Sequence, residues 1–114
     1  MRKLLLTAAA VITLSVPALS ADERDFTIVN GTGYELSFIG VNPPGDNELG
    51  SGLDDGGKVL VKFNGADKGC FWNIKVKWTG YAEQVFFEGL DLCSITTVTL
   101  QYDRSSKKTT ALIQ

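Results

Sequence analysis

The sequence predicts an all-β fold, a single-domain antiparallel β-sandwich of about seven strands, immunoglobulin-like or similar, with one disulfide. Short segments with an apolar residue at every second position recur along the chain, and this period of two is typical of strands with one buried face. Turn signals separate these segments by roughly eight to twelve residues. In the clearest segment, residues 70–78, the apolar positions are Cys70, Trp72, Ile74, Val76 and Trp78.

Residues 1–21 are predicted to be a signal peptide, because a basic start precedes an apolar run and then a group of small residues. Cleavage is expected after Ser20 or Ala21 and leaves residues 22–114 as one β-sandwich domain. The apolar run is short for a membrane span, so an N-terminal anchor is the weaker alternative. No membrane span is expected after signal removal, and the predicted localisation is periplasmic or secreted.

The charge balance argues against nucleic acid as a partner. Loss of Arg2 and Lys3 with the signal peptide leaves nine basic residues against thirteen acidic ones, a net charge of −4. A mildly acidic domain lacks the positive field that attracts phosphate backbones or anionic lipid.

The two cysteines, Cys70 and Cys93, predict a disulfide, because an isolated pair in an exported chain is normally oxidised. The bridge closes a loop of roughly two dozen residues, which is worth about 3 kcal/mol in the chain-entropy description. The spacing is unlike Cys-x-x-Cys, so no redox role is expected.

The first half of the domain contains two predicted strands and a long loop. Residues 26–29 form the first strand, and the Asn-Gly pair at 30–31 predicts a tight turn, which is favoured over the glycosylation acceptor that Asn30-Gly31-Thr32 also matches. The second strand, residues 34–41, places Tyr34, Leu36 and Phe38 on one face and can lie centrally in its sheet. Five glycines and two prolines make residues 42–57 a long loop, and Leu49 and Leu53 are expected to tuck onto the sandwich through one helical turn.

The second half alternates strands and turns. Residues 58–63 form a strand with Val59, Val61 and Phe63 inward. The strand at residues 70–78, which has the clearest period of two, follows. The later strands are predicted at residues 83–87, 95–102 and 109–113, with a short linker at 88–93.

The order of these features resembles a group of small exported bacterial β-domain proteins of unassigned function. The segments that carry the resemblance are Phe26–Tyr34, Pro43–Leu53, Gly57–Phe63, Cys70–Lys75 and Glu88–Cys93. Relatives in this group tend to carry Trp before the glycine of the long loop, where this chain has Leu49. The resemblance implies a disulfide-linked sandwich and supplies no activity.

Catalytic chemistry is largely missing from the sequence. The chain has no histidine, which removes the commonest general base and transition-metal ligand. With both cysteines oxidised, no thiol nucleophile or zinc site is expected, and no nucleophile-elbow or phosphate-loop motif occurs. Enzymatic activity is therefore not expected. A paired-carboxylate hydrolase using Glu83, Glu88 and Asp91 is the alternative.

Two groups of residues are candidate binding sites. Oxygen ligands from Asp46, Asn47, Glu48, Asp54 and Asp55 can converge on a hard cation such as Ca²⁺, although solvated turn residues are the simpler interpretation. No other cofactor is expected. Phe71, Tyr81 and Phe86 can form an exposed partner face, unless the loop at 42–57 covers it.

Together these features predict an exported, non-enzymatic binding or interaction module whose partner is another protein or a glycan. Besides the hydrolase, an inhibitor of another exported protein, with the 42–57 loop inserted into its target, remains an alternative.

Overall fold

The computed structural model describes residues 22–42, 45–64 and 68–114, so the predicted signal peptide lies outside the described residues. The described part contains seven strands and no helix. The strands are β1 (Phe26–Gly31), β2 (Leu36–Asn42), β3 (Lys58–Val61), β4 (Phe71–Trp78), β5 (Gln84–Asp91), β6 (Thr97–Asp103) and β7 (Lys108–Ile113). Each corresponds to a predicted strand, which confirms the all-β prediction.

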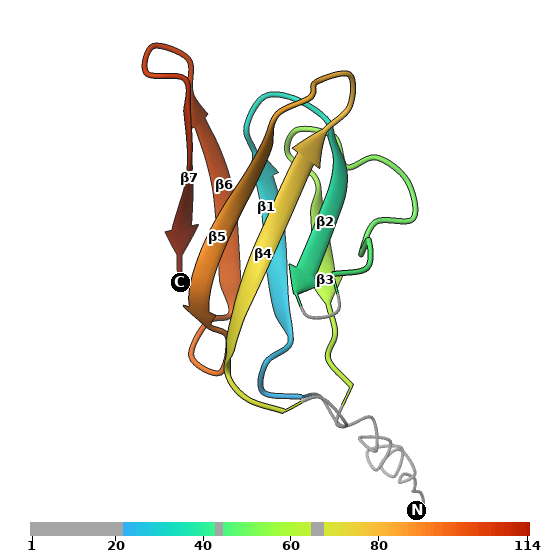
Figure 1. Cartoon of the computed structure of the whole chain (residues 1–114), viewed down its shortest axis with the longest axis vertical. Helices are drawn as coiled ribbons and strands as arrows, with labels where there is room; N and C mark the ends of the chain where they lie inside the picture. Colours follow the sequence, from blue (N-terminus) through green and yellow to red (C-terminus); the bar gives the residue numbers. More distant parts are fainter. Residues whose placement is uncertain (1–21, 43–44, 65–67) are drawn as a thin grey trace, which may run out of the picture.

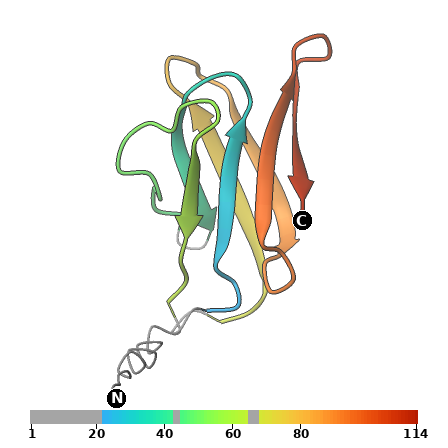
Figure 2. The same ribbon diagram turned by 180° about the vertical axis from the view of Figure 1, so that it is seen from behind.

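The strands form two sheets that pack face to face as a sandwich (Figure 1). One sheet has the order β3-β1-β6-β7 and the other has the order β2-β4-β5. Figure 2 shows the four-stranded sheet in front of the three-stranded one. The strands are antiparallel neighbours except for β1 and β6, which run parallel. This parallel pair departs from the predicted antiparallel sandwich and arises because the chain leaves the sheet between these strands to build β2, β4 and β5.

The core is the apolar layer between the two sheets. Ile28, Val98 and Leu100 enter it from the four-stranded sheet and are fully buried. Strand β4 has the predicted alternation, because its inward residues Trp72, Ile74, Val76 and Trp78 are all buried. Val61 is buried as predicted, and Val59 and Phe63 pack against the core at its margin.

Strand β2 differs from its prediction in two respects. Leu36 is buried and Tyr34 packs against the core, as predicted. A register shift between Leu36 and Phe38 turns Phe38 outward, so Ile39 and Val41 face the core and the prediction for Phe38 is wrong. A bulge of this kind adds one residue to a strand and reverses the facing of everything after it. The strand also lies at the edge of its sheet rather than at the centre.

Two turn predictions are corrected as well. Asn30 and Gly31 belong to β1, and the positive φ of the following connection falls at Gly33, with a value of 89°. The predicted linker at 88–93 is instead largely strand, because β5 continues to Asp91. A register shift opposite Trp72 and a positive φ at Gly89 let the strand continue past this point.

The described part of the long loop runs back along the edge of β2. Single bridges join Gly40 to Asn47 and Leu36 to Leu53, and they replace the helical turn that was predicted. Leu49 is buried and Leu53 packs against the core, as predicted. The loop therefore covers the edge of β2 and does not reach the exposed Phe71 and Phe86.

The predicted disulfide is present. Cys70 and Cys93 are joined with an S–S distance of 2.03 Å and a Cα–Cα distance of 5.2 Å. The bridge ties the start of β4 to the segment that follows β5, at the end of the sandwich where the described chain begins (Figure 1).

Replacing both Cys70 and Cys93 by alanine should lower the free energy of unfolding by about 3 kcal/mol, because the bridge restricts a loop of 23 residues in the unfolded chain. Urea unfolding of the oxidised wild type and the double variant measures the loss. Equal midpoints would show that the bridge contributes nothing to stability.

Candidate functional site

A buried asparagine organises the end of the sandwich opposite the disulfide. Asn30 is fully buried, and its side-chain amide uses every hydrogen-bonding position it has. Nδ2 donates to the carbonyl oxygens of Tyr34 and Leu53, each at 2.8 Å. Oδ1 accepts from the backbone N–H of Thr32 at 3.0 Å and from its hydroxyl at 2.7 Å. The amide thus joins β1, the β1–β2 connection and the long loop.

This network also fixes an aromatic side chain. The indole Nε1 of Trp78, at the end of β4, donates to the buried hydroxyl of Thr32 at 3.2 Å. The carboxylate of Asp55 accepts the backbone N–H of Gly33 at 2.8 Å and holds the loop against the same connection. Because the amide of Asn30 is buried and fully bonded, the folded chain cannot present it for glycosylation.

A pocket of about 260 Å³ opens beside this network. Its lining residues come from or near three turns, those joining β1 to β2, β4 to β5 and β6 to β7, which lie at the same end of the sandwich (Figure 1). Its walls are the three tyrosines of the chain, Tyr34, Tyr81 and Tyr102, together with Trp78. Tyr34 meets Tyr81 edge-on at 5.8 Å between ring centroids and Tyr102 at 5.9 Å, a favourable aromatic geometry.

Charges of both signs border the pocket. Glu83 comes from the β4–β5 turn and Lys107 from the β6–β7 turn. Arg104, in the same turn as Lys107, places its guanidinium over the Tyr34 ring at 5.5 Å. Asp103 holds this turn in shape: its carboxylate accepts the Ser105 hydroxyl at 2.7 Å, and that hydrogen bond is the main cause of its lowered pKa.

Of the predicted partner face, Phe71, Tyr81 and Phe86 are exposed by 71%, 57% and 54%. They do not form one surface. Tyr81 lines the pocket, whereas Phe86 lies on the outer face of the three-stranded sheet, opposite Lys75 in the register. Phe71 stands on that face nearer the disulfide.

The outer face of the three-stranded sheet combines aromatic rings with lysines. The ammonium of Lys77 lies 4.9 Å from the centroid of the Phe38 ring, and that of Lys75 lies 5.4 Å from Phe38 and 5.7 Å from Phe86. These are cation–π distances. The face is therefore apolar and basic, although its lysines already interact with its own rings.

The predicted cation ligands are spread along the loop. Asn47 turns inward, and its Oδ1 accepts backbone N–H groups from Ile39 and Leu49. Partial burial and the neighbouring Asp46 raise the pKa of Glu48. Within residues 22–42, 45–64 and 68–114, no three of the loop's carboxylates lie close enough to share an ion. The Ca²⁺ site remains a prediction, and the loop geometry gives it no support. The same hydrogen bonds and the single bridges hold the described part of the loop against β2, and its insertion into a target remains a prediction.

The predicted hydrolase residues are not brought together. Glu83 precedes β5 and Asp91 ends it, so at roughly 3.3 Å per residue they lie about 26 Å apart. Glu88 lies between them and is exposed. Glu83 is the only carboxylate on the wall of the pocket among the described residues.

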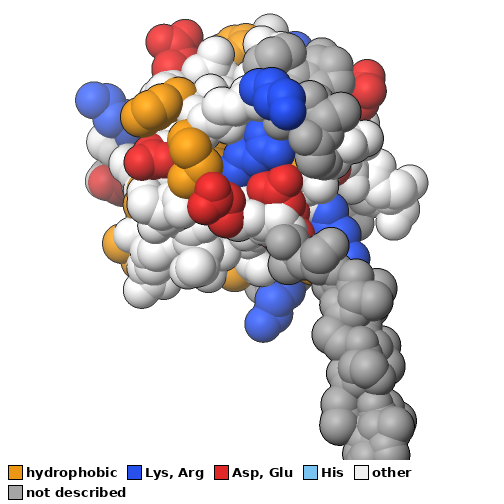
Figure 3. All heavy atoms as spheres, turned by 90° about the horizontal axis from the view of Figure 1, so that it is seen from below, with side chains coloured by type: hydrophobic (Ala, Val, Ile, Leu, Met, Phe, Trp, Pro, Cys, Tyr) orange, Lys and Arg blue, Asp and Glu red, His pale blue; other side chains and the backbone are white. Residues whose placement is uncertain are grey.

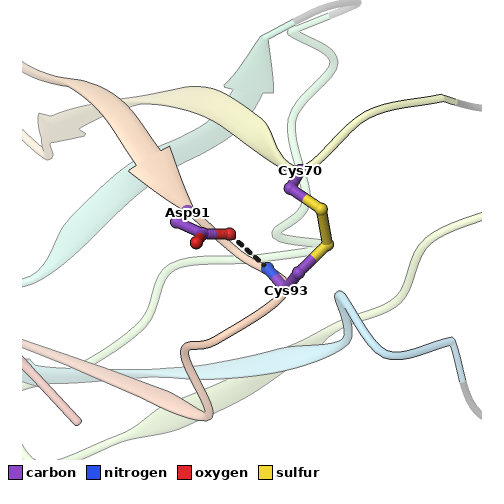
Figure 4. A group of neighbouring side chains, drawn as sticks. All are labelled: Cys70, Asp91 and Cys93. Carbon is purple, nitrogen blue, oxygen red and sulfur yellow. Dashed lines mark hydrogen bonds between the residues drawn. A yellow bond between two sulfur atoms is a disulfide. The ribbon is translucent and has the colours of Figure 1, made fainter.

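At the opposite end, Asp91 lies beside the disulfide (Figure 4). Its carboxylate and the two sulfurs lie within 4.8 Å of one another, a spacing found in metal sites. The sulfurs are bonded to each other, so neither is a thiolate ligand. Asp91 instead accepts the backbone N–H of Cys93 at 3.2 Å and shapes the turn after β5.

A buried arginine closes the same end. Arg24 stacks over the Phe63 ring at 4.7 Å and pairs with Asp22 at 2.8 Å. Hydrogen bonds from Arg24 lower the pKa of Asp22 to about 2. Figure 3 views this end from below and shows acidic, basic and hydrophobic side chains interspersed. A depression of about 450 Å³ beside the disulfide includes Asp22 and Arg24, whose charges pair with each other.

The sequence pattern predicts only part of this pocket. It indicates Tyr81 and Glu83 as candidate site residues, although for other sites, and it does not indicate Tyr34, Tyr102 or Lys107. A usable signal existed, because all three tyrosines stand at strand ends or turns. Knowing which turns share one end of the sandwich would have brought them together.

No family model, curated protein or solved structure matches the chain. The resemblance to small exported bacterial β-domain proteins therefore stays a prediction. Within the described residues, no helix has the length and apolar character needed to cross a membrane. The disulfide is typical of proteins that fold in an oxidising compartment outside the cytoplasm.

Replacing Asn30 by alanine should lower the free energy of unfolding by at least about 2 kcal/mol, because buried carbonyl and N–H groups lose their partners. Gln101→Ala, at an exposed strand position, is the matched control and should change stability by less than about 0.5 kcal/mol. Similar urea midpoints for the two variants would contradict the role given to Asn30.

Replacing Asp22 by asparagine should reduce stability at neutral pH, with a difference from wild type that shrinks as the pH falls. Asp22 titrates at 3.8 when unpaired and at about 2 in the folded chain, so its contribution is complete above pH 3.8 and is lost toward pH 2. Urea unfolding across this range measures the difference, with Glu23→Gln as the exposed control. A difference that stays constant with pH would show that the Asp22 charge is not involved.

Proposed function

We propose that this chain is an exported, non-enzymatic binding module, periplasmic or secreted, whose binding site is the tyrosine-walled pocket. The observation that carries the proposal is the meeting of Tyr34, Tyr81 and Tyr102 around one pocket with a free carboxylate and a free ammonium at its border. Binding sites are typically concave and largely apolar, with a few polar groups that orient the ligand.

The position of the pocket supports the same proposal. It is built by turns at one end of a sandwich, where sequence can vary without disturbing the core. The sheets and the disulfide supply a rigid frame, and the Asn30 network fixes the connection that carries Tyr34. The signal-like residues 1–21 and the disulfide support export.

A second candidate site is the outer face of the three-stranded sheet, where the exposure of Phe71 and Phe86 favours a protein partner. Exposed aromatic residues are common at the centre of protein interfaces. On this alternative the pocket is incidental, and variants of the two sites distinguish the two hypotheses.

The test uses the two tryptophans as internal reporters. Trp78 lines the pocket, whereas Trp72 lies toward the disulfide and donates its indole N–H to the Gly69 carbonyl at 2.9 Å. Small aromatic and saccharide compounds added to ¹⁵N-labelled residues 22–114 should shift the Trp78 indole signal and leave the Trp72 signal in place.

Tyr102→Ala should weaken the binding of any such compound by about tenfold, since a wall of the pocket is lost. Phe71→Ala, which removes an exposed ring outside the pocket, is the matched control and should bind as the wild type does. Loss of binding in Phe71→Ala but not in Tyr102→Ala would move the site to the sheet face.

A further inference from the structure

The pocket holds two opposite charges that are not used by the protein itself. Among the described residues, the side chains of Glu83 and Lys107 form no hydrogen bond or ion pair, and the only ion pair present is that of Arg24 and Asp22. Both border one pocket but come from different turns. A ligand that carries both charges can therefore meet both groups at once, and each contact is charge-assisted.

The backbone that presents Lys107 is unusual. Its φ of 58° is the only positive value among the described residues other than glycine. A long side chain in this left-handed region costs about 1 kcal/mol or more, and such outliers cluster at functional sites. The turn is fixed by Asp103, whose carboxylate bonds to Ser105 and leaves the ammonium of Lys107 without a partner in the turn.

The distribution of charge favours an acid group on one wall and an amine on the other. Lys107 lies on the β6–β7 side of the pocket, where Arg104 outside the lining places its guanidinium over the Tyr34 ring, and Glu83 lies on the β4–β5 side. The same pocket is lined by Tyr34, Tyr81 and Tyr102, whose rings offer an aromatic surface against which a planar apolar group can pack. A volume of about 260 Å³ lies just below the range of roughly 300–1,000 Å³ that accommodates drug-sized ligands.

We propose that the pocket binds a free aromatic amino acid, with its ammonium at Glu83, its carboxylate at Lys107 and its ring against the tyrosine side chains that line the pocket. This inference rests on the proposed function and adds the chemical class of the ligand. A free amino acid carries both charges on one carbon, which suits a small pocket with one free group of each sign. No bond is formed or broken, so the ligand is held and released unchanged.

The experiment compares four probes that share one ring. L-phenylalanine carries both charges, 3-phenylpropionate only the acid, 2-phenylethylamine only the amine, and benzyl alcohol neither. Each is titrated into ¹⁵N-labelled residues 22–114, and the Trp78 indole signal reports binding, with Trp72 as the internal control. L-phenylalanine should bind about tenfold more tightly than either singly charged probe, because each lost contact is charge-assisted.

Two variants separate the charges. Glu83→Gln should abolish the preference for L-phenylalanine over 3-phenylpropionate, and Lys107→Asn should abolish its preference over 2-phenylethylamine. Asparagine is chosen because it adopts a positive φ readily, so the turn is retained. Glu88→Gln and Lys108→Gln, which change exposed charges outside the pocket, should keep both preferences.

The outcomes distinguish this inference from the function it rests on. Equal binding of all four probes at Trp78 would overturn the zwitterion inference and leave the pocket as a binding site. Tight binding of a saccharide without binding of L-phenylalanine would also overturn the zwitterion inference while leaving the pocket as a binding site. If no probe or saccharide shifts Trp78, both the inference and the proposed pocket fail.

Discussion

The pocket end of this sandwich depends on one buried amide. Asn30 lies where β1 leaves the core, and four backbone and hydroxyl groups from the β1–β2 connection and the long loop converge on its side chain. A buried polar group is tolerable only when its partners are all present, so this site has little freedom to rearrange. This network holds the β1–β2 connection, which carries Tyr34, in place. It also holds the indole of Trp78, which donates to Thr32. The walls of the pocket are thus fixed by hydrogen bonds that lie beneath them in the fold.

The two ends of the molecule have different roles. At one end the disulfide, the Arg24–Asp22 pair and the edge-to-face Phe63 and Trp72 rings hold the segments together. At the other end three turns surround an open pocket whose charged groups are unused by the fold. A small domain buries a modest share of its surface and benefits from such cross-links. These cross-links lie at one end, and the pocket lies at the other.

The period-two pattern predicted all seven strands, because a sandwich core imposes that pattern on every strand that crosses it. The pattern could not reveal the bulge that turns Phe38 outward, since a bulge depends on pairing with a partner strand. Nor could it reveal the pocket, because Tyr34, Tyr81 and Tyr102 are distant in sequence and meet only in the folded sandwich. The Asn-Gly pair predicts a turn at Asn30, because such pairs are common in tight hairpins. In the structure Asn30 is instead a buried residue of β1.

The most direct test of this account is hydrogen exchange at the Asn30 side chain, followed by NMR on residues 22–114. If the amide holds the pocket end together, its Nδ2 hydrogens should exchange only through global unfolding, far more slowly than those of Asn42, which is exposed at the end of β2. Exchange of Asn30 as fast as that of Asn42 would show that the network opens freely in the folded chain, and it would contradict the central claim.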